Sequence, residues 1–180
     1  MGTYFFYETL PGTTRPWQLG AATLANHFSK QPAQLPRVQQ TEWDAPDCSQ
    51  WIAAIDAAVG QYPAGTVVLL AHSLACTAVA HWAKKYNRPI KGALLVAPSD
   101  IETPAYTFPS TGFTPIPLEP LPFKTIVVTS DNDVWVSAQR AHYFASCWGS
   151  QFVNIGDAGH INADAGFGPW PQGMALIQQF

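Results

Sequence analysis

Three kinds of side chain in this sequence could together carry out nucleophilic catalysis. Ser73 lies within 67-VVLLAHSLACTAVAHWA-83, while Asp131, Asp133 and His160 lie further along the chain. A serine hydroxyl becomes an effective nucleophile when an imidazole within hydrogen-bond reach takes its proton. A buried carboxylate then holds that imidazole in the right tautomer and stabilises its charged form. These residue types therefore predict a Ser-His-Asp catalytic triad.

The elements that must position these side chains are short strands and helices in alternation. Apolar runs predict six strands, at residues 3–8, 37–43, 66–71, 92–97, 125–130 and 151–156. Helices are expected at 17–29, 49–58, from Ser73 onward, at 137–148 and at 172–179. The continuous apolar character of the third, fourth and fifth runs is typical of strands that are covered on both faces. The alternation predicts one α/β domain over residues 1–180, a three-layer α/β/α sandwich around a parallel sheet.

Such a sheet would bring the candidate residues together. Ser73 follows the third run, Asp131 and Asp133 follow the fifth, and His160 follows the sixth. All strands of a parallel sheet end at the same edge, so residues just after different strands converge in space. The chain order Ser, Asp, His is the order found in α/β-hydrolases.

Each side chain also has a structural interpretation. Ser73 is a favoured helix N-cap, Asp133 could cap the next helix, and His160 could bridge carbonyls in a glycine-rich loop. Asp100 and Asp157 also fit the position of the acid. The joint occurrence of the three types, in order and at strand ends, favours the triad over coincidence.

The turn around Ser73 departs from the G-x-S-x-G pattern of a nucleophile elbow, because both glycines are alanines, Ala71 and Ala75. Strand and helix pack closely at such a turn, which requires small residues at these two sites. Alanine adds only one methyl group at each site. The substitutions therefore weaken the motif without removing it.

An oxyanion formed at Ser73 needs two preorganised N–H donors. One is expected from the backbone of Leu74, at the start of the helix. The other is expected from the loop after the first strand, near Gly12 or Thr13.

A proline-rich stretch at residues 98–123 leaves the carboxyl end of the fourth strand. A loop of this length inside a compact domain is usually functional or disordered. We expect it to form one wall of a small apolar pocket, with Phe108, Phe113 and Trp135 as candidate lining residues. The alternative is an ordered crossover that replaces a helix.

Composition excludes several classes of partner. Only 12% of residues are charged, the net charge is −3 and no Lys/Arg cluster occurs, which argues against nucleic acid and anionic membranes. Three cysteines without a C-x-x-C motif argue against disulfides and zinc and fit the cytoplasm. The sequence has neither a secretory signal nor a nucleotide-binding motif, so no cofactor is expected.

Five segments resemble the small cytosolic serine hydrolases related to retinoblastoma-binding protein 9 and to YdeN. They are 42-EWDAPD-47, 67-VVLLAHSLACTAVAHWA-83, 92-GALLVAPSDIE-102, 121-LPFKTIVVTSDNDVWVS-137 and 157-DAGHINADAGFGPWPQG-173. The resemblance implies a minimal α/β-hydrolase fold without a lid domain, with six strands in the order 2-1-3-4-5-6. It places the nucleophile on Ser73, the base on His160 and the acid on Asp133.

The expected function is hydrolysis of small carboxylic esters through an acyl-enzyme. One alternative is a catalytically weak or inactive binding protein, which the altered elbow and the short loop at 10-LPGTTRPW-17 would suit. Another is a thioesterase or acyltransferase that uses the same triad. A protein partner has no support in the sequence.

Overall fold

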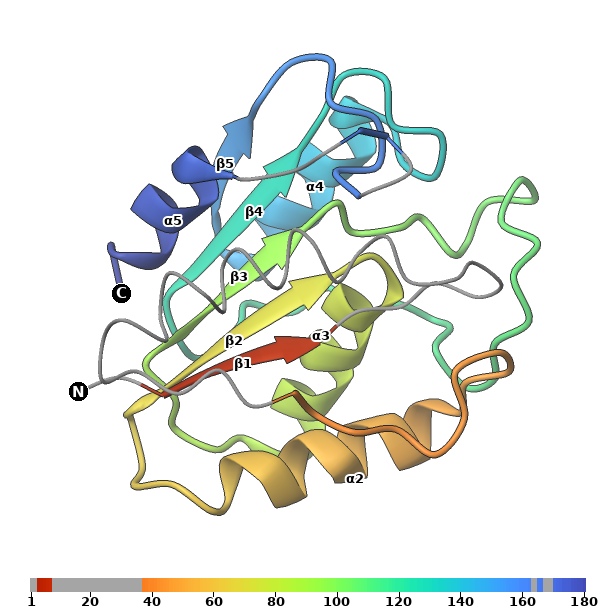
Figure 1. Cartoon of the computed structure of the whole chain (residues 1–180). Helices are drawn as coiled ribbons and strands as arrows, with labels where there is room; N and C mark the ends of the chain where they lie inside the picture. The colour runs from red at the N-terminus through yellow and green to blue at the C-terminus, as the bar shows by residue number, and fades with distance from the viewer. Residues whose placement is uncertain (1–2, 8–36, 163–164, 167–169) are drawn as a thin grey trace.

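A parallel β-sheet runs through the middle of the computed structural model, which describes residues 3–7, 37–162, 165–166 and 170–180 (Figure 1). Its strands are β1 (Thr3–Tyr7), β2 (Val67–His72), β3 (Gly92–Val96), β4 (Thr125–Thr129) and β5 (Gln151–Asn154), in the order β1-β2-β3-β4-β5. All four pairings are parallel. The helices are α2 (Cys48–Val59), α3 (Leu74–Tyr86), α4 (Ala138–Trp148) and α5 (Pro171–Ile177).

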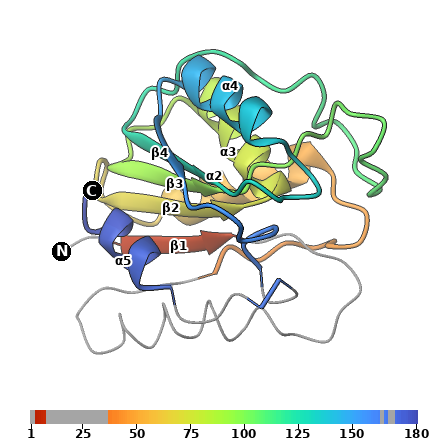
Figure 2. The same cartoon turned by 90° about the horizontal axis from the view of Figure 1, so that it is seen from above.

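The helices cover the sheet on both faces, which gives three layers. Figure 2 shows α2, α3 and α4 on one face and α5 on the other. Alternate strand residues supply the two cores: Leu69 packs on the side of the three helices, and Val68 packs on the side of α5. This arrangement explains why β2, β3 and β4 are continuously apolar and buried.

Side-chain caps and a glycine define the ends of two helices. The Asp47 carboxylate accepts a hydrogen bond from the Gln50 N–H at 3.0 Å and so caps α2. The Ser137 hydroxyl accepts from the Arg140 N–H at 3.1 Å at the start of α4. Gly149, with φ 68°, ends α4 in the left-handed region.

The described residues form five strands, whereas six were predicted. The predicted second strand is reduced to a single-residue β-bridge at Arg37, and residues 38–43 adopt no strand conformation. This segment lies along α2 instead: Gln40 Nε2 donates to the Trp51 carbonyl at 3.3 Å, and Thr41 Oγ1 donates to Gln50 Oε1 at 3.0 Å. Val38 of this segment is buried in the main core, while the neighbouring polar side chains bond to α2. The expected helix at 17–29 lies outside the described residues, and none of the described helices is long and apolar enough to cross a membrane.

Candidate active site

The turn between β2 and α3 places Ser73 in a strained backbone conformation. Its φ is 60° and its ψ is −129°, which costs a residue with a Cβ about 1–3 kcal/mol. The turn is fixed by two backbone hydrogen bonds, from Ser73 N–H to the Val96 carbonyl and from Cys76 N–H to the Ser73 carbonyl, both at 3.0 Å. The Ser73 side chain makes no capping hydrogen bond to α3, so its hydroxyl is free for another partner.

The methyl groups of the two alanines in the turn, Ala71 and Ala75, pack into the core. Ala71 is 2% exposed and Ala75 is fully buried, and both belong to the main core. The tight turn therefore forms around their methyl groups, and the departure from G-x-S-x-G does not prevent the elbow.

His160 lies within hydrogen-bond distance of both Ser73 and Asp133. His160 Nε2 is 2.9 Å from Ser73 Oγ. On its other side, His160 Nδ1 is 2.8 Å from Asp133 Oδ2 and 3.0 Å from Oδ1. The side chain of Asp133 is fully buried and that of His160 is 4% exposed, so water screens their interaction little.

The structure separates Asp133 from two of the other candidate acids, Asp131 and Asp100. Asp133 Oδ1 also accepts the Trp135 N–H at 2.8 Å, which fixes the carboxylate toward the imidazole. Asp131 is exposed and accepts from Asn154 Nδ2 at 2.6 Å, and Asp100 pairs with Arg140 at 3.2 Å. These contacts direct the latter two carboxylates to other partners.

The loop that presents His160 is tied to the segment that follows β4. Ser130 Oγ donates to the Gly159 carbonyl, and Gly159 N–H donates to Asn132 Oδ1 at 2.6 Å. Gly159 has φ 55°, and a Cβ there would lie 2.6 Å from the Ala165 side chain, so both conformation and space require glycine.

His72 joins the turn of Ser73 to the loop of His160. Its Nε2 lies 2.7 Å from the His160 carbonyl, so this nitrogen carries the proton and donates. The two imidazole rings also meet edge to face at 4.7 Å. Burial, followed by the charge of His160, lowers the pKa of His72 to about 3, so His72 is neutral. This hydrogen bond fixes the His160 loop against the turn of Ser73.

A further hydroxyl near Ser73 did not emerge from the sequence. Ser99 Oγ lies 2.7 Å from Ser73 Oγ, and Ser99 is 1% exposed. Its position in the sequence could have marked it as a site residue, because Ser99 follows β3 at the same sheet edge as the other site residues.

The predicted oxyanion donors are described only in part. Leu74 is the first residue of α3, where backbone N–H groups lack partners within the helix and the helix dipole favours negative charge. Gly12 and Thr13 lie outside the described residues.

The three predicted pocket residues have different surroundings. The Trp135 ring lies 6.5 Å from that of His160 and 5.8 Å from that of Tyr106, which in turn lies 6.4 Å from Phe108. An aromatic row thus runs from His160 into the proline-rich loop. Phe113 instead packs edge to face on Trp51 in the core, at 5.6 Å, so we assign it to the core rather than to a pocket wall.

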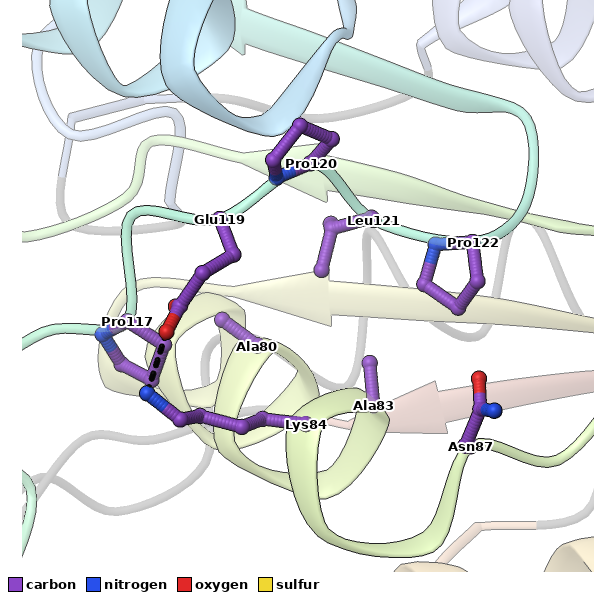
Figure 3. A pocket seen from close by; sticks show the side chains of 9 residues that line it. All are labelled: Ala80, Ala83, Lys84, Asn87, Pro117, Glu119, Pro120, Leu121 and Pro122. Carbon is purple, nitrogen blue, oxygen red and sulfur yellow. Dashed lines mark hydrogen bonds and ion pairs between the residues drawn. The ribbon is translucent and has the colours of Figure 1, made fainter.

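A separate cavity of about 260 Å³ lies between α3 and the end of the proline-rich loop (Figure 3). The residues around it include Ala83, Leu121 and the ion pair of Lys84 with Glu119, and none belongs to the triad. Within the described ranges, no group of three or more His, Cys, Asp or Glu side chains is placed to hold a metal ion.

Comparisons with known proteins find hydrolases of similar fold. A family model described as "Serine hydrolase" matches residues 21–179. A YdeN-like hydrolase from Pectobacterium atrosepticum is 30% identical, with a TM-score of 0.80 over 99% of this chain and 90% of that one. The ydeN gene product of B. subtilis is 14% identical, with a TM-score of 0.74 over 99% of this chain and 97% of that one. An esterase domain from a Rhodothermus marinus protein is 15% identical, with a TM-score of 0.67 over 92% and 81% of the two chains. A search of curated proteins gives no match.

Proposed function

The chain belongs to the serine hydrolase family, as a small α/β-hydrolase of the YdeN-like type, and from this premise we propose that it hydrolyses small carboxylic esters through Ser73. The observation that carries the proposal is the continuous chain of hydrogen bonds from Ser73 Oγ through His160 to Asp133. In this proposal Ser73 is the nucleophile, His160 the general base and Asp133 the group that orients and stabilises the imidazole.

The proposed reaction has two steps. In the first, the Ser73 proton moves to His160 Nε2 while Oγ bonds to the ester carbonyl carbon. The tetrahedral oxyanion is stabilised by the Leu74 N–H, and its collapse expels the alcohol, which takes the proton from His160. In the second, water gives a proton to His160 and attacks the acyl group, and Ser73 leaves as its hydroxyl is restored.

The surroundings of the triad support a small, apolar substrate group. Trp135 and Tyr106 extend an aromatic surface away from His160. Aromatic surfaces of this kind bind apolar acyl or alkyl groups, while a few polar groups fix the reacting carbonyl. The structural neighbour described as an esterase domain has the same fold and is consistent with this substrate class.

Hydrolysis of p-nitrophenyl acetate tests the proposal. The native chain should release p-nitrophenol catalytically, with an initial burst close to one equivalent if deacylation is slow. Ser73→Ala should lose this turnover while keeping the native melting temperature. Undiminished turnover by Ser73→Ala would contradict the proposal. A thioester of the same acyl group, if turned over with a higher kcat/KM, would favour thioesterase activity by the same residues.

A further inference from the structure

The Ser99 hydroxyl occupies a position that the chain maintains at a cost in backbone strain. Ala97, which directly follows β3, has φ 47°, which costs a residue with a Cβ about 1–3 kcal/mol. Ala97 N–H donates to the Val128 carbonyl at 2.8 Å, and Asp100 N–H donates to the Trp135 carbonyl at 2.9 Å. These bonds fix the chain on both sides of Ser99, whose hydroxyl is held against Ser73.

The direction of the hydrogen bond between the two serines follows from the triad. His160 Nδ1 faces both Asp133 oxygens, at 3.0 and 2.8 Å, and therefore carries the ring proton. In the neutral imidazole Nε2 is then an acceptor, so the single proton of the Ser73 hydroxyl points to Nε2. Ser73 Oγ has only lone pairs left for Ser99, and the Ser99 hydroxyl must be the donor.

Within the described part of the chain, the Ser99 hydroxyl has no second hydrogen-bond acceptor. The contact with Ser73 is the one that the Ser99 hydroxyl makes there, and Ser99 is 1% exposed. A buried donor aimed at an atom where charge develops needs no rearrangement during the reaction, and low exposure strengthens its effect.

We propose that Ser99 is a further catalytic residue, which donates a hydrogen bond to Ser73 Oγ as negative charge develops on that atom. This inference rests on the proposed function. During acylation the Ser73 O–H bond breaks, its proton goes to His160 Nε2, and an Oγ electron pair bonds to the carbonyl carbon. Ser99 keeps its own proton throughout. During deacylation the carbon–Oγ bond breaks, and Ser99 donates to Oγ again until His160 returns the proton.

The test measures how fast a fluorophosphonate reacts with the native chain and with Ser99→Ala. In this reaction Ser73 Oγ bonds to phosphorus, the proton goes to His160 and fluoride leaves, so acylation chemistry is followed without deacylation. A hydrogen bond to a charged group predicts a loss of about tenfold or more in the second-order rate constant. Ser150→Ala is the matched control, because its hydroxyl bonds to Thr125 Oγ1 at 2.6 Å, away from the triad, and its rate should equal the native one.

The pH profile of the same rate separates catalysis from a structural role. The acid limb reports protonation of the base, so loss of the Ser99 donor should lower the plateau and leave the midpoint of that limb unchanged. A native-like plateau in Ser99→Ala, or a shifted midpoint that signals displacement of His160, would overturn the inference. Reaction of the native chain, together with none in Ser73→Ala, would leave the proposed function standing in either case. If the folded native chain does not react, the proposed function fails and this inference fails with it.

Discussion

Replacing His72 with Gln should make folding less sensitive to acid. The His72 imidazole is 6% exposed and donates from Nε2 to the His160 carbonyl. Burial and the charge of His160 lower its pKa in the folded chain to about 3, from an ordinary value of 6.5. A glutamine amide at this position can also donate a hydrogen bond, but it has no proton to gain in this pH range.

The size of the effect follows from the difference between the two pKa values. Between pH 6.5 and about 3, the unfolded chain binds a proton at His72 and the folded chain does not. Stability therefore falls as the pH falls through this window. A pH of 5 is about 1.5 units below the pKa of the imidazole in the unfolded chain. Protonation of His72 in the unfolded chain should therefore lower the stability by about 2 kcal/mol relative to pH 8.

Urea unfolding of the native chain and His72→Gln, at pH 8 and at pH 5, measures this difference. Other titrating groups contribute equally to both proteins, and a constant change in stability cancels when each protein is compared with itself. The native chain should lose about 2 kcal/mol more than the variant between the two pH values. Equal losses would refute the conclusion that His72 is buried and neutral.

Three further substitutions test separate parts of the structure. Asp133→Asn should lower kcat for p-nitrophenyl acetate by about 10⁴-fold, because an amide donor in place of the acceptor selects the wrong imidazole tautomer. Asp131→Asn is its control and should stay within about twofold of native; equal losses in the two variants would contradict the assignment of the acid. Ser137→Ala should lower the free energy of urea unfolding by about 1 kcal/mol through loss of the α4 cap, and an unchanged midpoint would contradict that role. Gly92→Ala should cost about 1–3 kcal/mol, seen as a lower melting temperature, because its Cβ would lie 2.6 Å from the Lys124 carbonyl oxygen; native-like melting would show that the backbone yields there.

The sequence was most informative where one physical requirement dominates. Strands covered on both faces must be continuously apolar, and this pattern located β2, β3 and β4 to within a residue or so at each end. The segment at 37–43 lacked such a requirement. Its polar side chains form hydrogen bonds with α2. These bonds depend on the position of the packed helix rather than on local propensity.

The sequence predicted the edge of the sheet at which the candidate site lies and the order of its residues along the chain. It did not predict which side chains form hydrogen bonds there. Residues alone left several acids open, and the resemblance pointed to Asp133, whose contact with His160 depends on the path of two loops. Ser99 and Phe113 show the same limit. Both lie in or beside the proline-rich stretch, where no periodicity indicates which side chains turn toward Ser73 and which enter the core.

If Ser73 is an activated nucleophile, it should react covalently with an electrophilic phosphonate. The measurement is the intact mass of the native chain and of Ser73→Ala after exposure to a fluorophosphonate, with peptide mapping of any adduct. A single adduct on Ser73 is expected in the native chain and none in the variant. An unlabelled native chain that is shown to be folded, or an adduct that persists in Ser73→Ala, would contradict this expectation.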